Sequence, residues 1–145
     1  MNILVAVDLS PASEDVVEAA GRVAKLTGAT VYILHAAEPE PDFVGYDAGP
    51  EVVRTQVAQE LRKEHRDVQA LAEKLRSDGV EATALLVRGP TVETTLKEAE
   101  SLEAELIVLG THGHGAVYDV LIGSYSAGII RKSKLPVLVV PIRDS

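Results

Sequence analysis

The chain has 145 residues, of which 46% are hydrophobic and 3% aromatic, with a formal net charge of −8 at pH 7 and no cysteine. This length suits one domain, residues 1–145, whose core is built from Val, Leu, Ile and Ala. The acidic balance and scarce aromatic rings disfavour binding to nucleic acid or an anionic membrane, and the lack of cysteine excludes disulfides and thiol chemistry.

The N-terminus begins almost at once with an apolar run, residues 3–7, which predicts a buried strand. A signal peptide has a basic stretch before its apolar run, and no such stretch precedes residues 3–7. No stretch of the chain reaches the roughly 18 apolar residues of a membrane span. We therefore expect a cytoplasmic protein that makes no membrane contact.

Ser10 and Pro11 predict the start of the first helix, with the Ser10 hydroxyl as its cap, and Gly28 predicts its end. Residues 30–34 form the second predicted strand. His35 follows it and is interpreted as a structural histidine with satisfied ring nitrogens. Residues 38–50, rich in proline and glycine, are predicted to be a loop.

A long helix is predicted over residues 51–77, with His65 within the spacing of its apolar stripe and Gly79 after its end. Residues 82–87 predict a third strand, and Gly89-Pro90 a turn. Thr91 is predicted to cap the helix that follows.

Residues 105–109 predict a fourth strand, residues 124–132 a short helix, and Val137–Val140 a fifth strand. This alternation of strands and helices predicts an α/β fold with a parallel sheet and helices on both faces. We expect an open, twisted, Rossmann-like sheet in the order 3-2-1-4-5.

A glycine motif lies between the fourth strand and the short helix: Gly110-x2-Gly113-x9-Gly123-Ser124. Glycines let the backbone approach an anion closely, and the N–H groups at a helix start favour negative charge. The hydroxyls of Ser124 and Ser126 can donate to phosphate or cap the helix. The alternative is a purely structural role, in which the loop only turns the chain.

Two histidines, His112 and His114, flank Gly113, but no third ligand is evident and we expect no metal site. His112 is expected to order the loop or lie near a phosphate.

The carboxyl ends of parallel strands meet at one sheet edge, where ligands of such folds bind. This rule brings Asp8, Ala36, Gly89 and the glycine loop together. The loop would take phosphates, and Asp8 would accept from base or ribose donors.

Several segments, in order, resemble the ATP-binding branch of the universal stress protein family. They are ILVAVDLSPAS, LHA at residues 34–36, IVLGTHG, the nine-residue spacer, GSYS and KLPVLVV. The resemblance covers essentially the whole chain. Two departures stand out: Gly89-Pro90-Thr91 replaces the common Gly-x-Pro, and Ala36 replaces a frequent Val.

The resemblance implies that Asp8 contacts the adenine end, that Ala36 lines the base pocket, and that Leu109 and Gly110 run beside base and ribose. It implies that the phosphates are surrounded by Gly113, Gly123, Ser124, Tyr125 and Ser126. Ala6 and His112 complete the expected nucleotide site. It also implies a homodimer paired through Val137–Val140.

The expected function is that of an ATP-binding regulatory protein of the stress response, with ADP or AMP as other ligands and Mg²⁺ accompanying the nucleotide. A P-loop ATPase is excluded because G-x-x-x-x-G-K-[ST] is missing. A receiver domain would need an aspartate after the third strand, which ends Leu86-Val87-Arg88. No catalytic residue is assigned. A weak ATP hydrolase and a nucleotide-independent homodimeric interaction module are the alternatives.

Overall fold

The computed structural model describes residues 1–37, 50–111 and 122–142, with residues 50–57 described by their backbone alone. The strands of this part are β1 (Asn2–Ala6), β2 (Thr30–Ala37), β3 (Ala82–Arg88), β4 (Leu106–Gly110) and β5 (Val137–Val140). The helices between them are α1 (Ser13–Thr27), α2 (Pro50–Ser77), α3 (Thr91–Ser101) and α4 (Ser124–Lys132). The predicted alternation is confirmed.

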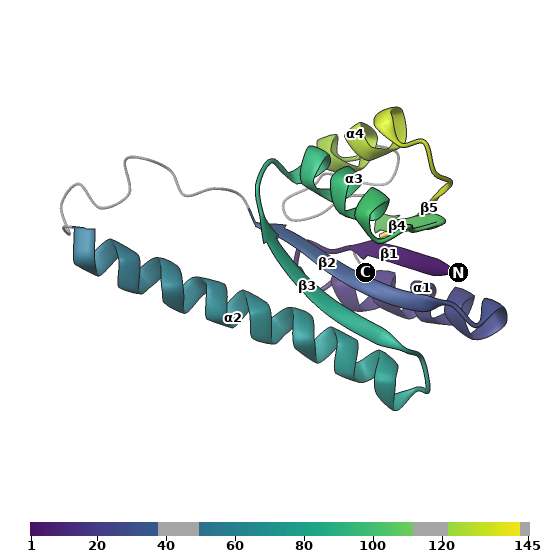
Figure 1. Ribbon diagram of the computed structural model, residues 1–145, viewed down its shortest axis with the longest axis horizontal. Coiled ribbons are helices and arrows are strands. Elements are labelled where there is room, and N and C mark those ends of the chain that lie inside the picture. Colours follow the sequence, from purple (N-terminus) through teal and green to yellow (C-terminus); the bar gives the residue numbers. More distant parts are fainter. Residues whose placement is uncertain (38–49, 112–121, 143–145) are drawn as a thin grey trace.

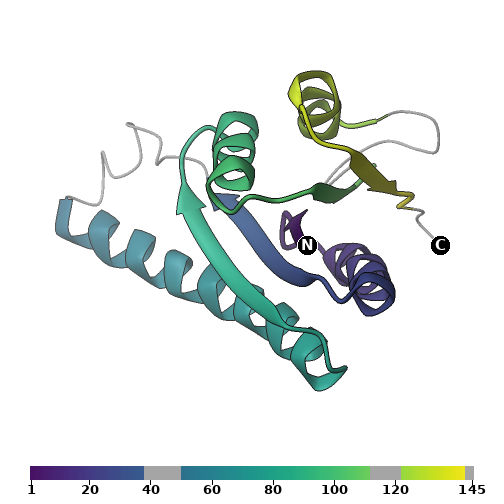
Figure 2. The same ribbon diagram turned by 45° about the vertical axis from the view of Figure 1, so that its right-hand side comes forward.

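The strands form one parallel sheet in the order β3-β2-β1-β4-β5, as expected (Figure 1). β1 lies at its centre, with Val5 opposite Ile33 on β2 and Val108 on β4. The chain winds outward from β1 in both directions, so the strand order reverses between β1 and β4. Figure 2 shows β3 and β5 at the two opposite edges.

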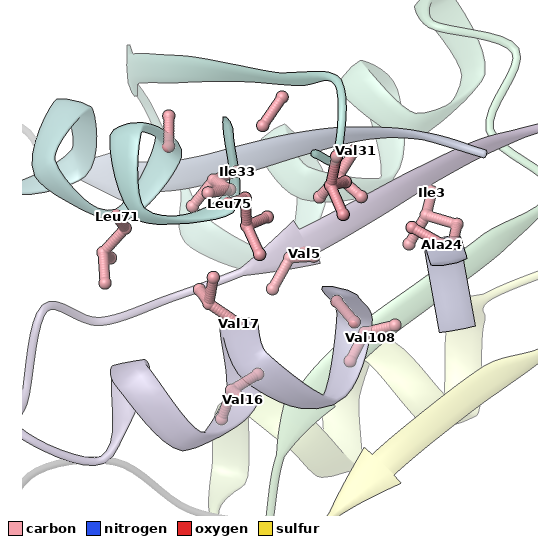
Figure 3. Close-up of a cluster of buried hydrophobic side chains, with 14 of the residues drawn as sticks. Ile3, Val5, Val16, Val17, Ala24, Val31, Ile33, Leu71, Leu75 and Val108 are labelled. Carbon is pink, nitrogen blue, oxygen red and sulfur yellow. The ribbon is translucent and has the colours of Figure 1, made fainter. Parts of the chain in front are cut away.

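Both faces of the sheet are covered, because side chains of a strand alternate between its faces. Ile3 and Val5 point toward α1 and α2, whose contributions to this cluster include Val17 and Leu75 (Figure 3). Leu4 and its neighbours point toward α3 and α4 on the other face. Because β1 and β4 are buried on both faces, their sequences contain unbroken runs of apolar residues.

The start of α1 differs from the prediction. The helix begins at Ser13 with Ala12 at its N-cap and no side-chain cap, so Ser10 does not cap it. Instead, Oδ1 of Asp8 accepts hydrogen bonds from the Ser10 N–H (2.9 Å) and the Ser13 hydroxyl (3.2 Å). The Asp8 carboxylate therefore stabilises the turn before α1, and the Ser10 hydroxyl does not cap the helix. The end at Gly28 is confirmed, with φ of 73°.

Other boundaries also shift. β2 continues to Ala37, because β3 pairs with it as far as Arg88, so His35 and Ala36 belong to the strand. α3 has Pro90 at its N-cap and Thr91 as its first residue, so Thr91 does not cap it. On α2, His65 is exposed and Glu64 is turned toward the sheet in its place.

Among the helices of the described residues, none is long and apolar enough to cross a membrane.

Two leucines test the burial that holds α2 and α1 in place. Leu75 on α2 is 3% exposed, whereas Leu26 on α1 is 88% exposed. We expect Leu75→Ala to lower the free energy of unfolding by about 2–5 kcal/mol, since it removes a packed side chain and leaves a cavity. Leu26→Ala is the matched control and should change it by less than about 0.5 kcal/mol in urea unfolding. Equal losses would contradict the placement of α2.

Candidate functional site

The carboxyl edge of the sheet brings together the ends of β1, β2 and β4 and the first turn of α4. Asp8 follows β1, Ala36 lies near the end of β2, and Gly110 ends β4. β1 and β4 are neighbours at the point where the strand order reverses. This is the position at which open α/β sheets bind ligands.

Backbone hydrogen bonds fix the two ends of the glycine segment. The Gly123 N–H donates to the Thr111 carbonyl at 2.8 Å, and the Thr111 N–H donates to the Val140 carbonyl at 3.0 Å. The Thr111 hydroxyl oxygen accepts from the Ile142 N–H at 3.0 Å. The end of β4 is therefore tied both to the start of α4 and to the chain after β5.

Thr111 was not singled out in the sequence analysis. Thr111 directly follows the strand and lies between Gly110 and Gly113 of the glycine motif. This position is the sequence feature that could have identified it as part of the site. Its contacts with β5 are long-range, so spacing alone does not reveal them.

Ser126 holds the same stem from the helix side. Its hydroxyl donates to the Gly110 carbonyl at 2.7 Å, and the residue is 4% exposed. A hydroxyl has a single hydrogen, so Ser126 cannot donate to a phosphate while this bond stands. The structure gives the side chain a positioning contact.

The first turn of α4 presents backbone donors. Gly123 occupies the N-cap in an extended conformation without a side-chain cap, so Ser124 is the first helical residue and does not cap the helix. The Ala127 N–H donates to the Gly123 carbonyl, so the N–H groups of residues 124–126 precede the first intrahelical bond. Ser124 is exposed at this point.

Charge distinguishes this helix start from two others. α1 carries Glu14 and Asp15 in its first turn and α3 carries Glu93, whereas α4 carries no acidic residue there. Internal carboxylates satisfy the partial positive charge of a helix N-terminus. α4 leaves that charge available to an external anion.

Tyr125 directs its side chain toward α3. Thr95, fully buried on α3, donates its hydroxyl hydrogen to the Thr91 carbonyl at 2.8 Å. The Tyr125 hydroxyl lies 2.6 Å from the Thr95 oxygen and donates to it. Burial raises the pKa of Tyr125 to about 12. The Tyr125 ring joins α4 to α3, and the backbone N–H of Tyr125 remains among the donors of the first turn.

Three residues of the expected nucleotide site, Ala6, Ala36 and Leu109, lie on the face covered by α3 and α4. Ala6 and Leu109 are 6% and 1% exposed, so their side chains are enclosed in the core. Ala36 is half-buried. A Cβ on Gly110 would lie 3.0 Å from Ile142 and 3.2 Å from Val16, so these side chains would have to shift to accommodate a larger residue there.

Asp8 is exposed at the same edge, and the residue after it, Leu9, has φ of 65°. This conformation is costly for a branched side chain and is held here by the bonds to the Asp8 carboxylate. His112 and Gly113 lie outside the described residues. Among the described residues, no group of three His, Asp or Glu side chains could hold a metal ion.

Comparisons with known proteins agree with this arrangement. The family model "Universal stress protein family" matches residues 1–141. A universal stress protein from Thermus aquaticus is 33% identical over 138 residues, 95% of this chain and 96% of that protein.

Two solved structures show the same fold. The hypothetical protein MJ0577 matches with a TM-score of 0.80 at 25% identity, over 99% of this chain and 97% of that one. A universal stress protein in complex with cAMP matches with a TM-score of 0.72 at 22% identity, over 97% and 96% of the two chains.

The Tyr125–Thr95 contact has a distinctive pH dependence. Because the folded-state pKa is about 12 and the ordinary value is 10.0, the contribution of the neutral phenol is complete below pH 10.0 and is lost as pH rises toward about 12. We expect Tyr125→Phe to cost about 0.5–1.5 kcal/mol in urea unfolding at neutral pH. The difference from the parent protein should shrink by about pH 11. A difference that stays constant over this range would contradict the burial of the hydroxyl.

Proposed function

This chain belongs to the universal stress protein family, and we propose that it is a regulatory protein of the stress response that binds ATP at the carboxyl edge of its sheet. The observation that carries the proposal is the start of α4. There, three backbone N–H groups stand at the end of the glycine segment, in a first turn that has no acidic residue.

The donor chemistry fits a phosphate chain. Backbone N–H groups and the positive end of the helix dipole favour an anion without any lysine or arginine. This explains how a chain with a net charge of −8 can bind a polyanion. The bonds from Gly123 and Ser126 to the end of β4 hold these donors in place before a ligand arrives.

The opposite end of the site suits a nucleoside. Asp8 offers a carboxylate to donors of the base or ribose, and the small side chain of Ala36 leaves space beside it. We propose that the nucleotide spans the β1–β4 boundary, with its phosphates at α4 and Mg²⁺ carried on them. A universal stress protein of the same fold was solved in complex with cAMP, which supports a nucleotide as the class of ligand.

No side chain of the described residues is assigned a catalytic role. The proposed activity is binding that changes the state of the protein. ADP and AMP would use the same donors with fewer phosphates.

We further propose a homodimer through β5. This strand ends the sheet, and an edge strand carries unpaired backbone groups that can pair with a second copy. Leu138 on the strand is 37% exposed, and Ile130 on the adjoining α4 is 42% exposed. Both are large apolar side chains that a partner would cover.

ATP binding is tested by placing a charge at the helix start. We expect Ser124→Asp to weaken ATP binding by at least about tenfold in calorimetric titration, because its carboxylate would occupy the anion position. The same variant should raise the free energy of unfolding by about 0.3–1 kcal/mol.

Ser124→Asn is neutral and keeps a polar side chain with a donor, so it is the matched control and should lose much less affinity than Ser124→Asp. Equal affinity in the two variants would place the phosphates elsewhere. A folded parent protein that binds no ATP would favour the nucleotide-independent homodimeric interaction module.

The dimer is tested by sedimentation velocity. Leu138→Lys should convert the protein to a monomer, because a charge would be buried at the edge of β5. Leu26→Lys changes a leucine that is 88% exposed on α1 and should leave the dimer intact. A parent protein that sediments as a monomer at high concentration would refute the proposed pairing.

A further inference from the structure

His35 lies outside the proposed nucleotide site, on the opposite face of the sheet from Ala36. On β2, Val31 and Ile33 point toward α1 and α2, and His35 continues that alternation. Its side chain is 15% exposed and lies between the end of β1 and the middle of α2. The proposed ATP site makes no use of this ring.

The hydrogen-bond partners of His35 determine where its protons lie. Nδ1 is 2.9 Å from the Val7 carbonyl oxygen, and a carbonyl oxygen can only accept, so Nδ1 carries a hydrogen. In the neutral ring, Nε2 then carries a lone pair. That nitrogen faces Oε2 of Glu64 at 3.5 Å.

Glu64 brings a second acceptor to the same point. Its Oε2 exposes less than 1 Å² and accepts no hydrogen bond from the described residues. Two acceptors therefore face each other in a water-poor position, which is unfavourable for both. One additional proton between them satisfies Nε2 and Oε2 together.

We propose that His35 and Glu64 share one exchangeable proton and that the hydrogen bond formed by this proton attaches α2 to the sheet. With the proton present, the ring donates to Val7 through Nδ1 and to Glu64 through Nε2, joining α2 to β2 and β1. When the proton leaves to solvent, the Nε2 bond is lost, and the Glu64 carboxylate must turn toward water. Attachment of this part of α2 is then weaker at high pH than at low pH.

The elements around this ring differ in the charged groups that they carry. β2 itself has no charged residue. At the end of β3, Arg88 is exposed and is opposite Ala37 in register, whereas His35 is opposite Leu86. Asp8, after β1, accepts from the turn that precedes α1. On α1, Glu14 pairs with Lys74 of α2 at the surface, at 3.9 Å.

The shared proton predicts a pH dependence, and its sign follows from which form of the pair makes the Nε2 bond. The interaction is gained by the protonated form, so it is present at low pH and lost as the pH rises. It does not involve the nucleotide, and its test uses the full chain without ligand.

The test follows the ring and the helix separately. We expect ¹⁵N spectra of the imidazole nitrogens to show the neutral ring of His35 as the Nδ1–H tautomer. The signals of His35 are assigned because they are absent from the spectrum of His35→Asn. Protection of the α2 amides around residue 64 from hydrogen exchange, corrected for intrinsic rates, should be roughly tenfold greater at about pH 5.5 than at about pH 8.5. A neutral Nε2–H tautomer would overturn the proposal.

Two variants of α2 make the result specific. The amide of Glu64→Gln can donate to the lone pair of Nε2, so this variant should keep α2 protected at both pH values. Glu73→Gln removes a carboxylate from the same helix, where Glu73 pairs with Arg76 at the surface, and should keep the pH dependence of the parent protein. The proposal fails if Glu64→Gln shows the same pH dependence as the parent protein.

Discussion

The structure depends on the burial of β1 and β4 as a parallel pair at the centre of the sheet. Their alternating side chains fill two separate cores, so a change of register would disturb both faces at once. The strand order reverses between these two strands, and their carboxyl ends lie at the same edge of the sheet. The candidate site is thus a consequence of the sheet order, and its backbone donors are supplied by the helix that follows β4.

Packing and ligand approach make overlapping demands on the glycines of this chain. A Cβ on Gly110 would make tight contacts with the side chains of Val16 and Ile142, and a Cβ on Gly128 would lie 3.0 Å from Val92, where α4 meets α3. Glycine at these positions is therefore not evidence of a ligand by itself. The stronger indication lies in the combination of a fixed loop stem and an acid-free first turn of α4.

Local patterns predicted the elements well, because runs of buried residues and glycine ends are encoded within each segment. The expected sheet order is also confirmed, but strand order is a long-range property that no single segment encodes. The prediction was wrong where a distant or competing contact decides. Ser10 does not cap α1, because Asp8 accepts a hydrogen bond from its N–H in the turn before the helix, and β2 is prolonged by pairing with β3. Glu64, not His65, faces the sheet, since the ring of His35 lies opposite it. Spacing also could not show that Ser126 and Tyr125 already have hydrogen-bond partners across the fold.

The most direct test of the account is a titration of the ¹⁵N-labelled protein with ATP, followed through its backbone amide resonances. If the phosphates bind at the start of α4, the amides of residues 124–126 should show the largest shifts, with smaller shifts around Asp8 at the nucleoside end. Saturable shifts confined to another part of the chain, with these amides unchanged, would contradict the central claim.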